Sequence, residues 1–194
     1  MLFVRHPRYG VGKRRLAADI GDANALRFQQ MMIARLLRRL ARDRRWRLRL
    51  AVTPDRAGRR LRPSPPGIPV AGQGSGDLGE RMRRALASCP PGPAILIGSD
   101  IPELGAAHIA AAFRLLGRVE LVFGPAADGG FWLVGARRSP RLPPLFGPVR
   151  WSQPDTLAQV LGNLPPRASV GFAARLEDVD DGDAWRRYAP SRGF

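Results

Sequence analysis

The chain of 194 residues has little lysine, little cysteine and no long apolar run. Lys13 is the only lysine among 32 basic residues, and Cys89 is the only cysteine, so no disulfide can form within the chain. No apolar run approaches the ~20 residues of a membrane span, and the N-terminus lacks the basic region and apolar core of a secretion signal. We therefore expect a cytoplasmic protein with one domain over residues 1–194, because this length can bury a core without disulfides.

The formal net charge is +16, which has two explanations. Arginines at positions 35, 38, 39, 42, 44, 45, 47 and 49 could form a basic face for nucleic acid or anionic lipid. Alternatively, a coding bias towards arginine, alanine, glycine and proline enriches arginine on any solvated surface. No RNA-recognition motif, zinc-finger spacing or heptad-linked basic region supports the first explanation. The sequence thus argues against a specific nucleic-acid partner, and a basic nucleic-acid-binding domain is the outside alternative.

Hydrophobic patterns alternate between strand and helix along the chain. The patterns predict helices over 22–43, 78–88, 106–116, 152–161 and 183–188, the fourth opening with a capping box at Ser152. They predict strands over 2–4, 47–53, 68–71, 93–98, 120–124, 131–135 and 172–176. We expect strand 47–53 to keep one wet face, strand 93–98 to be apolar on both faces, and 59–67 to be a surface loop. This order predicts an α/β class with a doubly wound, mostly parallel sheet.

The loop behind the first strand contains the single lysine. A strand, a turn with Gly10 and Gly12, and then a helix is the way α/β proteins present backbone N–H groups to phosphate. A compact, mobile ammonium can follow a phosphate better than a guanidinium can. A P-loop is excluded because its first glycine would fall at Pro7 and its metal-binding hydroxyl at Arg14. A dinucleotide fingerprint fails because Arg15 stands where the third glycine is needed.

Carboxylates recur at the ends of the predicted strands. Asp100 ends an apolar strand, Asp128 precedes two glycines, and Asp178 and Asp180 follow the last strand. Open α/β sheets bind ligands outside the carboxyl ends of their strands, where several carboxylates and one lysine suit Mg²⁺ and phosphate. Singly, these residues could equally be a helix cap, a turn residue and a solvated acidic run.

A series of motifs in this order resembles a known family: Pro7-x-x-Gly10-x-x-Lys13-x-Arg15-Leu16, Gly76-Asp77-Leu78-Gly79-Glu80-Arg81, Gly98-Ser99-Asp100, Asp128-Gly129-Gly130, Trp151-Ser152 and Asp178-Val179-Asp180. Over nearly the whole chain they look like the glycosyltransferase-A-fold proteins called radical-SAM/selenodomain-associated transferases, type 1. These are similar to nucleotidyltransferases of molybdenum-cofactor and deazaflavin-cofactor nucleotides, and to nucleotide-sugar transferases. The resemblance implies a single glycosyltransferase-A-type domain with a nucleotide in its N-terminal half.

Two departures from the resemblance stand out. Relatives carry Lys-Thr-Arg-Leu where this chain has Lys13-Arg14-Arg15-Leu16, so a hydroxyl contact is lost. Relatives also have more residues ahead of the first strand, which leaves open whether Met1 is the true start.

The resemblance implies roles for the nucleotide side of the site. Lys13, with Arg15 and the amides of Gly10 and Gly12, is expected to neutralise the phosphates. Asp77 and Gly79, in the segment 76–81, are expected to close over the base or the acceptor, unless they only begin a helix.

On the metal and acceptor side, Asp100 and Asp180 are expected to hold Mg²⁺ or Mn²⁺. Asp128 is expected to orient or deprotonate an unidentified small-molecule acceptor, acting with Lys13 in catalysis. The preferred reaction is glycosyl transfer from a nucleotide-sugar. Nucleotidyl transfer from a nucleoside triphosphate to a phosphorylated acceptor is the alternative, and the oligomeric state is open.

Overall fold

The computed structural model describes residues 1–60, 67–138, 142 and 144–189. Its strands form one seven-stranded sheet in the order β3-β2-β1-β4-β6-β5-β7. The strands are β1 (Leu2–Arg5), β2 (Leu50–Thr53), β3 (Val70–Gly72), β4 (Ala94–Ile97), β5 (Leu121–Pro125), β6 (Phe131–Ala136) and β7 (Val170–Phe172). Only β6 pairs in an antiparallel manner among these described strands, with β4 and β5 as its partners, and the other pairings are parallel. The predicted mostly parallel α/β sheet is confirmed.

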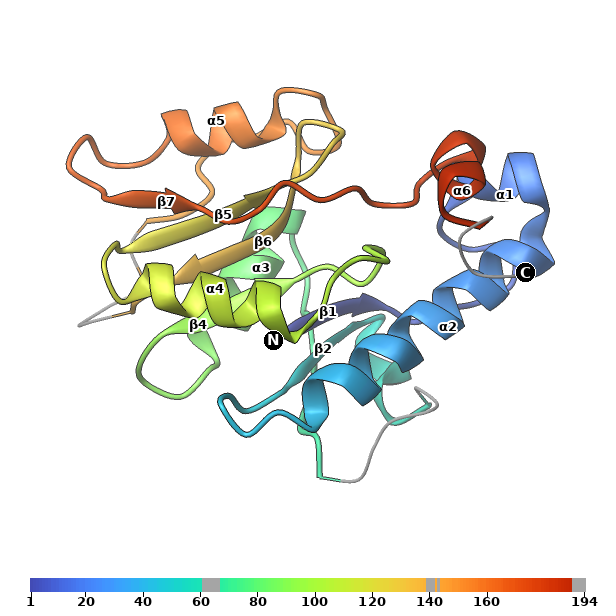
Figure 1. Cartoon of the computed structure of the whole chain (residues 1–194), viewed down its shortest axis with the longest axis horizontal. Helices are drawn as coiled ribbons and strands as arrows, with labels where there is room; N and C mark the ends of the chain where they lie inside the picture. The colour runs from blue at the N-terminus through green and yellow to red at the C-terminus, as the bar shows by residue number, and fades with distance from the viewer. Residues whose placement is uncertain (61–66, 139–141, 143, 190–194) are drawn as a thin grey trace.

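Helices cover both faces of the sheet (Figure 1). They are α1 (Arg14–Ile20), α2 (Asp22–Ala41), α3 (Leu78–Ala87), α4 (Ala106–Leu116), α5 (Thr156–Gly162) and α6 (Gly182–Tyr188), with a 3₁₀ helix, η1 (Asp55–Arg60). Buried residues of α2 and α4 pack with one face, and those of α3 and α5 pack with the other. Such two-sided cover explains why β4 is apolar at all four positions. No helix in the described ranges is both long and apolar enough to span a bilayer.

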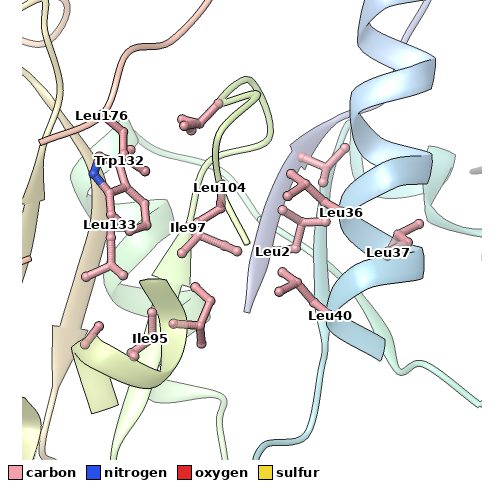
Figure 2. Packing of buried hydrophobic residues seen from close by; sticks show 14 of the residues in the cluster. Leu2, Leu36, Leu37, Leu40, Ile95, Ile97, Leu104, Trp132, Leu133 and Leu176 are labelled. Carbon is pink, nitrogen blue, oxygen red and sulfur yellow. The ribbon is translucent and has the colours of Figure 1, made fainter. Parts of the chain in front are cut away.

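The main core joins the two halves of the sheet (Figure 2). Leu36 and Leu40 of α2 face Leu2 of β1, and Leu37 belongs to the same cluster. Ile97 of β4 comes next, and beyond it the cluster continues to β6. Because β1 and β4 lie at the middle of this core, the loops at their carboxyl ends begin from well-fixed positions.

The C-terminal helix returns to the N-terminal part of the chain. Figure 1 shows α6 beside α1 and the start of α2. The ring of Trp185 meets that of Phe28 edge-on, with centroids 5.4 Å apart. Asp181 caps α6 by accepting a hydrogen bond from the Ala184 amide. The segment before α6, which carries Asp178 and Asp180, thereby lies against Lys13 in the loop behind β1 and against Asp100 at the end of β4.

Two of the predicted strands differ from the structure. The second strand begins at Leu50 and is buried at three of four positions, so the wet face predicted for 47–53 is wrong: β2 lies between β1 and β3 with helices on both sides. The last strand is Val170–Phe172 rather than 172–176: these three residues pair with Leu121–Phe123 of β5, and Leu176 forms only an isolated bridge to Ala126. Part of the predicted surface loop, 61–66, lies outside the described residues.

The predicted capping box at Ser152 is also wrong. Ser152 has φ 60°, in the left-handed region, and the helix begins only at Thr156. The Thr156 hydroxyl instead accepts a hydrogen bond from the Gln153 amide at 3.0 Å, which closes the turn ahead of α5.

Candidate active site

Two adjoining hollows open at the carboxyl ends of the strands. The larger, about 630 Å³, is called the basic cleft and is defined by Arg5, Lys13, Arg14, Arg15, Asp100 and Asp180. The smaller, about 210 Å³, is called the acidic hollow and is defined by Asp100, Asp128, Asp178, Phe131, Trp132 and Trp151. Ser99, Asp100 and Ser152 line both hollows. The end of β4 therefore separates two binding spaces that share a wall.

Lys13 lies at that shared wall and is surrounded by acceptors. Its side chain is only 7% exposed, and its Nζ lies 2.9 Å from Oδ2 of Asp100. The ammonium also forms an ion pair with Asp180 and donates to the Val179 carbonyl at 2.7 Å. Burial opposes the charge on Lys13, but the charges of Asp100 and Asp180 outweigh burial and raise the pKa of the ammonium. Lys13 is thus a fixed cation between two carboxylates.

The local backbone explains how these groups meet. Lys13 has φ 45° at the N-cap of α1, a left-handed conformation that turns the loop at the start of the helix. The Val179 amide donates to the Asp100 carbonyl at 3.1 Å and so joins the segment before α6 to the end of β4. Ser99 donates to Oδ1 of Asp100 at 2.9 Å, which orients that carboxylate.

The remaining residues predicted to bind nucleotide lie in three places. Gly12 and Arg15 line the basic cleft, where Arg15 is exposed and pairs with Asp180 at 3.3 Å. Gly10 is in the turn of the same loop. Asp77 is the N-cap of α3 and forms a capping box with Glu80. Nucleotide binding by these residues stays a prediction.

Gly79 lies in the first turn of α3, against the aromatic wall of the acidic hollow. A Cβ at Gly79 would come within 2.6 Å of the Trp151 ring and 2.7 Å of Phe146. The Phe146 and Trp151 rings are 5.8 Å apart, and Phe131 stacks on Phe146 at 6.2 Å. The absence of a side chain at Gly79 therefore lets α3 approach the aromatic wall closely.

Asp128 is held by a tight turn between β5 and β6. Its Oδ1 accepts a hydrogen bond from the Gly130 amide at 2.9 Å. Gly129 has φ 86°, and a Cβ there would lie 1.8 Å from the Pro154 carbonyl oxygen. Only glycine fits this contact, which brings the turn close to the segment that carries Trp151.

Asp178 joins Asp128 in the acidic hollow. Burial, followed by the charges of Asp180 and Asp128, raises the pKa of the Asp178 carboxyl to about 6. A carboxyl group with such a pKa can both accept and release a proton near neutral pH. The sequence placed Asp178 at a strand end without a separate role.

Two carboxylates near Lys13 are the candidate ligands of a divalent cation. Asp100 and Asp180 converge on one point, which the Lys13 ammonium occupies. Across the described ranges, no group of three or more His, Cys, Asp or Glu side chains gathers to hold a metal ion. In phosphate sites, however, Mg²⁺ is usually bound by only one or two carboxylates, and water and substrate phosphates complete its coordination. Metal binding by Asp100 and Asp180 stays a prediction, and it requires the Lys13 ammonium to leave the point between them.

A hollow of about 990 Å³ lies at the opposite edge of the sheet. Met1, Pro69 and Pro93, which precede β1, β3 and β4, line it. Open α/β sheets bind their ligands at the carboxyl ends of the strands, so we assign the site to the basic cleft and the acidic hollow.

No pattern in the sequence indicates that Arg5 lines the basic cleft or that an aromatic wall lines the acidic hollow. Arg5 ends β1 and lines the basic cleft, but one arginine among so many gives no signal. Trp151 appeared only as part of a motif, and its contact with Gly79 joins segments far apart in the chain.

The sheet order and the two hollows define a protein of glycosyltransferase-A-like, nucleotide-diphospho-sugar transferase type. The chain belongs to the family described as uncharacterized proteins conserved in bacteria (DUF2064), whose profile matches residues 36–153. No curated protein matches the chain. The resemblance inferred from the motifs is thereby confirmed at the level of this class.

Solved structures support the same class. A candidate nucleotide-diphospho-sugar transferase from Desulfovibrio desulfuricans G20 is 27% identical with a TM-score of 0.82, covering 99% of this chain and 86% of that one. Rv0371c from Mycobacterium tuberculosis H37Rv, in complex with manganese, is 18% identical with a TM-score of 0.57, covering 98% and 97%. CMP:2-keto-3-deoxy-manno-octonic acid synthetase with CTP is 10% identical with a TM-score of 0.55, covering 96% and 94%. The last two show the fold alone.

Proposed function

We propose that this protein transfers a sugar from a nucleotide-sugar to the hydroxyl group of a small acceptor. The observation that carries the proposal is the position of Asp100, which lines both the basic cleft and the acidic hollow. A transferase must bring a charged leaving group and a nucleophile to either side of one reacting atom. Two hollows that differ in charge and share one wall support that task.

The donor diphosphate binds in the basic cleft. Arg5, Lys13 and Arg15 supply cationic donors there, with loop amides at Gly10 and Gly12. Asp100 and Asp180 would hold Mg²⁺ or Mn²⁺, and such an ion would supply positive charge to offset the charge that develops on the diphosphate. Lys13 exchanges its contacts with the two carboxylates for phosphate oxygens. The manganese in the Rv0371c complex supports a metal-dependent site of this kind.

The acceptor binds in the acidic hollow, where Asp128 serves as its base. The acceptor oxygen forms a bond to the anomeric carbon of the sugar, and the bond from that carbon to the diphosphate oxygen breaks. The electron pair of the broken bond leaves with the nucleoside diphosphate, and the hydroxyl proton passes to the Asp128 carboxylate. Positioning and charge stabilisation supply most of the catalysis.

Nucleotidyl transfer is the second candidate, supported by the fold shared with a CTP-bound synthetase. A phosphorylated acceptor is already an oxyanion and needs no base, whereas a hydroxyl acceptor does. The carboxylates Asp128 and Asp178 in the acidic hollow therefore favour sugar transfer.

The experiment incubates the full chain with Mg²⁺ or Mn²⁺ and two panels of donors, nucleotide-sugars and nucleoside triphosphates. We expect release of a nucleoside diphosphate from one nucleotide-sugar. Pyrophosphate released from a triphosphate would instead establish nucleotidyl transfer. If no donor reacts and none raises the melting temperature, the protein is not a nucleotide-dependent transferase.

Two variants make the result specific. Asp128→Asn keeps the side-chain shape and should abolish transfer while leaving donor binding intact. Asp183→Asn is the matched control, because Asp183 is an exposed carboxylate on α6 that pairs with Arg186 and lines neither hollow.

A further inference from the structure

The two hollows differ most in the sign of their charge. The chain has 32 basic and 16 acidic residues, so arginine is the charged side chain expected on any surface. Among the described residues that line the acidic hollow none is basic, although three are aspartates. Among those that line the basic cleft, four are basic. Composition alone does not explain this separation.

The carboxylates of the acidic hollow are only partly compensated. Asp100 is paired with Lys13. Neither Asp128 nor Asp178 forms an ion pair with any described residue. Arg175 donates to the Ala127 carbonyl beside Asp128, but it does not line the hollow. An anionic ligand in this hollow would therefore face two carboxylates without an ion-pair partner, and like charges brought together select against such a ligand.

Much of the remaining lining of the acidic hollow is aromatic and apolar. Phe131, Trp132 and Trp151 line it, together with Leu78 and Met82 of α3. The stack of Phe131 and Phe146 and the contact of Phe146 with Trp151 fix the Trp151 ring in place. Such a rigid aromatic wall contacts a flat, apolar face of a ligand at little cost in side-chain entropy.

The volume of the acidic hollow restricts the ligand further. At about 210 Å³ it is below the range of about 300–1,000 Å³ that is usual for drug-sized ligands. Ser152, Gln153 and Thr156 add hydrogen-bonding groups to the lining. The hollow thus suits a small ring with hydroxyl groups along one edge.

We propose that the acidic hollow binds an uncharged or cationic hydroxyl compound with an apolar face, such as a neutral or amino sugar ring, and rejects its phosphorylated form. This assignment rests on the proposed function for the direction of transfer, but the selection by charge belongs to the hollow itself. Asp128 and Asp178 are the residues that reject the anion, and Trp151 is the residue that contacts the ring.

The test uses the four tryptophans of the chain as internal reporters. Trp132 and Trp151 line the acidic hollow, whereas Trp46 stacks on Phe113 and Trp185 packs on Phe28, away from both hollows. The full chain is labelled with 5-fluorotryptophan, and each ¹⁹F signal is assigned by a Trp→Phe variant. The probes are glucosamine, glucose and glucose 6-phosphate, which share one ring and differ in charge.

We expect glucosamine and glucose to shift the Trp151 signal, and glucose 6-phosphate to require at least a tenfold higher concentration. The signals of Trp46 and Trp185 should stay in place. Replacing both Asp128 and Asp178 by Asn should reduce the discrimination to below about threefold, and the control Asp183→Asn should leave it unchanged. Glucose 6-phosphate binding as well as glucose would overturn the proposal, as would no shift of Trp151 with any of the three sugars.

The failure of this proposal can be told from the failure of the proposed function. If nucleoside diphosphate release requires a phosphorylated acceptor, the function stands and the charge selection is wrong. If the ¹⁹F signals discriminate but no nucleotide-sugar reacts, the hollow selects as proposed and the donor assignment is wrong.

Discussion

The basic cleft and the acidic hollow share Asp100 but are built from different parts of the chain. The basic cleft takes its charges from the end of β1, the loop behind it and Asp180. The acidic hollow is lined chiefly by residues between Leu78 and Thr156, nearly all of them within the region that matches the family profile. Lys13, Arg15 and Asp180 lie outside that region. Membership of the family therefore bears more directly on the acidic hollow than on the basic cleft.

A comparison of the two linings shows how a protein with a formal net charge of +16 contains a hollow lined by aspartates and by no basic residue among those described. Arginines on the surface are numerous, but α3, β6 and the segment before α5 line the acidic hollow with Leu78, Met82, Phe131, Trp132 and Trp151. The single lysine marks the boundary, because it forms an ion pair with Asp100, whereas Asp128 and Asp178 form no ion pair with a described residue. Substitutions in either hollow, or at the wall that they share, test whether the two hollows differ in this way.

The largest effect is expected at the shared wall. Asp100→Asn should lower the rate of transfer by about 10³-fold, because a bound metal ion contributes several kcal/mol to such reactions. The amide is isosteric, and Ser99 can still bond it, so the fold should be retained. Steady-state rates at several Mg²⁺ concentrations measure the effect, and circular dichroism checks the fold. An unchanged Mg²⁺ requirement would remove Asp100 from the metal site.

The second-largest effect is expected in the turn between β5 and β6, which holds Asp128. Gly129→Ala should destabilise the protein by about 2–4 kcal/mol, since it adds a Cβ in a left-handed conformation and against the Pro154 carbonyl. Gly92→Ala is the control, because Gly92 has φ 111° but open space around it, so only backbone strain of about 1 kcal/mol applies. Urea unfolding compares the two variants. Equal losses of stability would show that the close contact at Gly129 is not rigid.

Much of the fold could be predicted from sequence because local patterns determine it. The stripe of leucines on α2 and the apolar run of β4 were enough to place a helix and a buried strand, and α4 was predicted over the residues that form it. The start of α5 could not be predicted, because a left-handed Ser152 and a contact with Gly129 decide it. Those contacts depend on tertiary structure.

The candidate site was predictable in part for the same reason. Asp100 and Asp128 stand at strand ends, which a sequence pattern can locate. The ion pair of Lys13 with Asp180 joins residues 167 positions apart, and it depends on α6 packing beside α1. No pattern along the chain contains that information, nor the charge separation of the two hollows.

A smaller effect is expected on the donor side alone. Lys13→Arg keeps the charge but replaces a compact ammonium in a site that is only 7% exposed, so nucleotide affinity should fall by about 1–2 kcal/mol. Arg44→Lys, an exposed exchange in the opposite direction, is the control. Isothermal titration with a nucleoside diphosphate and Mg²⁺ gives the affinities. If Lys13→Arg binds the nucleotide as tightly as the wild type does, Lys13 does not contact phosphate. In either case, binding of the sugar probes in the acidic hollow should not change.

The smallest effect is expected for Asp178 in the acidic hollow, and it concerns the stability of the protein as a function of pH. The pKa of Asp178 is raised to about 6 in the folded protein, against 3.8 when it is not perturbed, so the folded state binds the proton more tightly than the unfolded state does. The wild type should therefore lose stability relative to Asp178→Asn as the pH rises from about 4 to about 6, and the difference should stay constant above pH 6. Because Asp178 is half-buried, solvent screening limits the gain of the variant at pH 7 to about 1 kcal/mol. Urea unfolding at a series of pH values, in EDTA to keep metal away, measures it. If the wild type is more stable than Asp178→Asn at pH 7, a cationic partner must compensate the charge of Asp178. The acidic hollow would then lack the uncompensated charge that distinguishes it from the basic cleft.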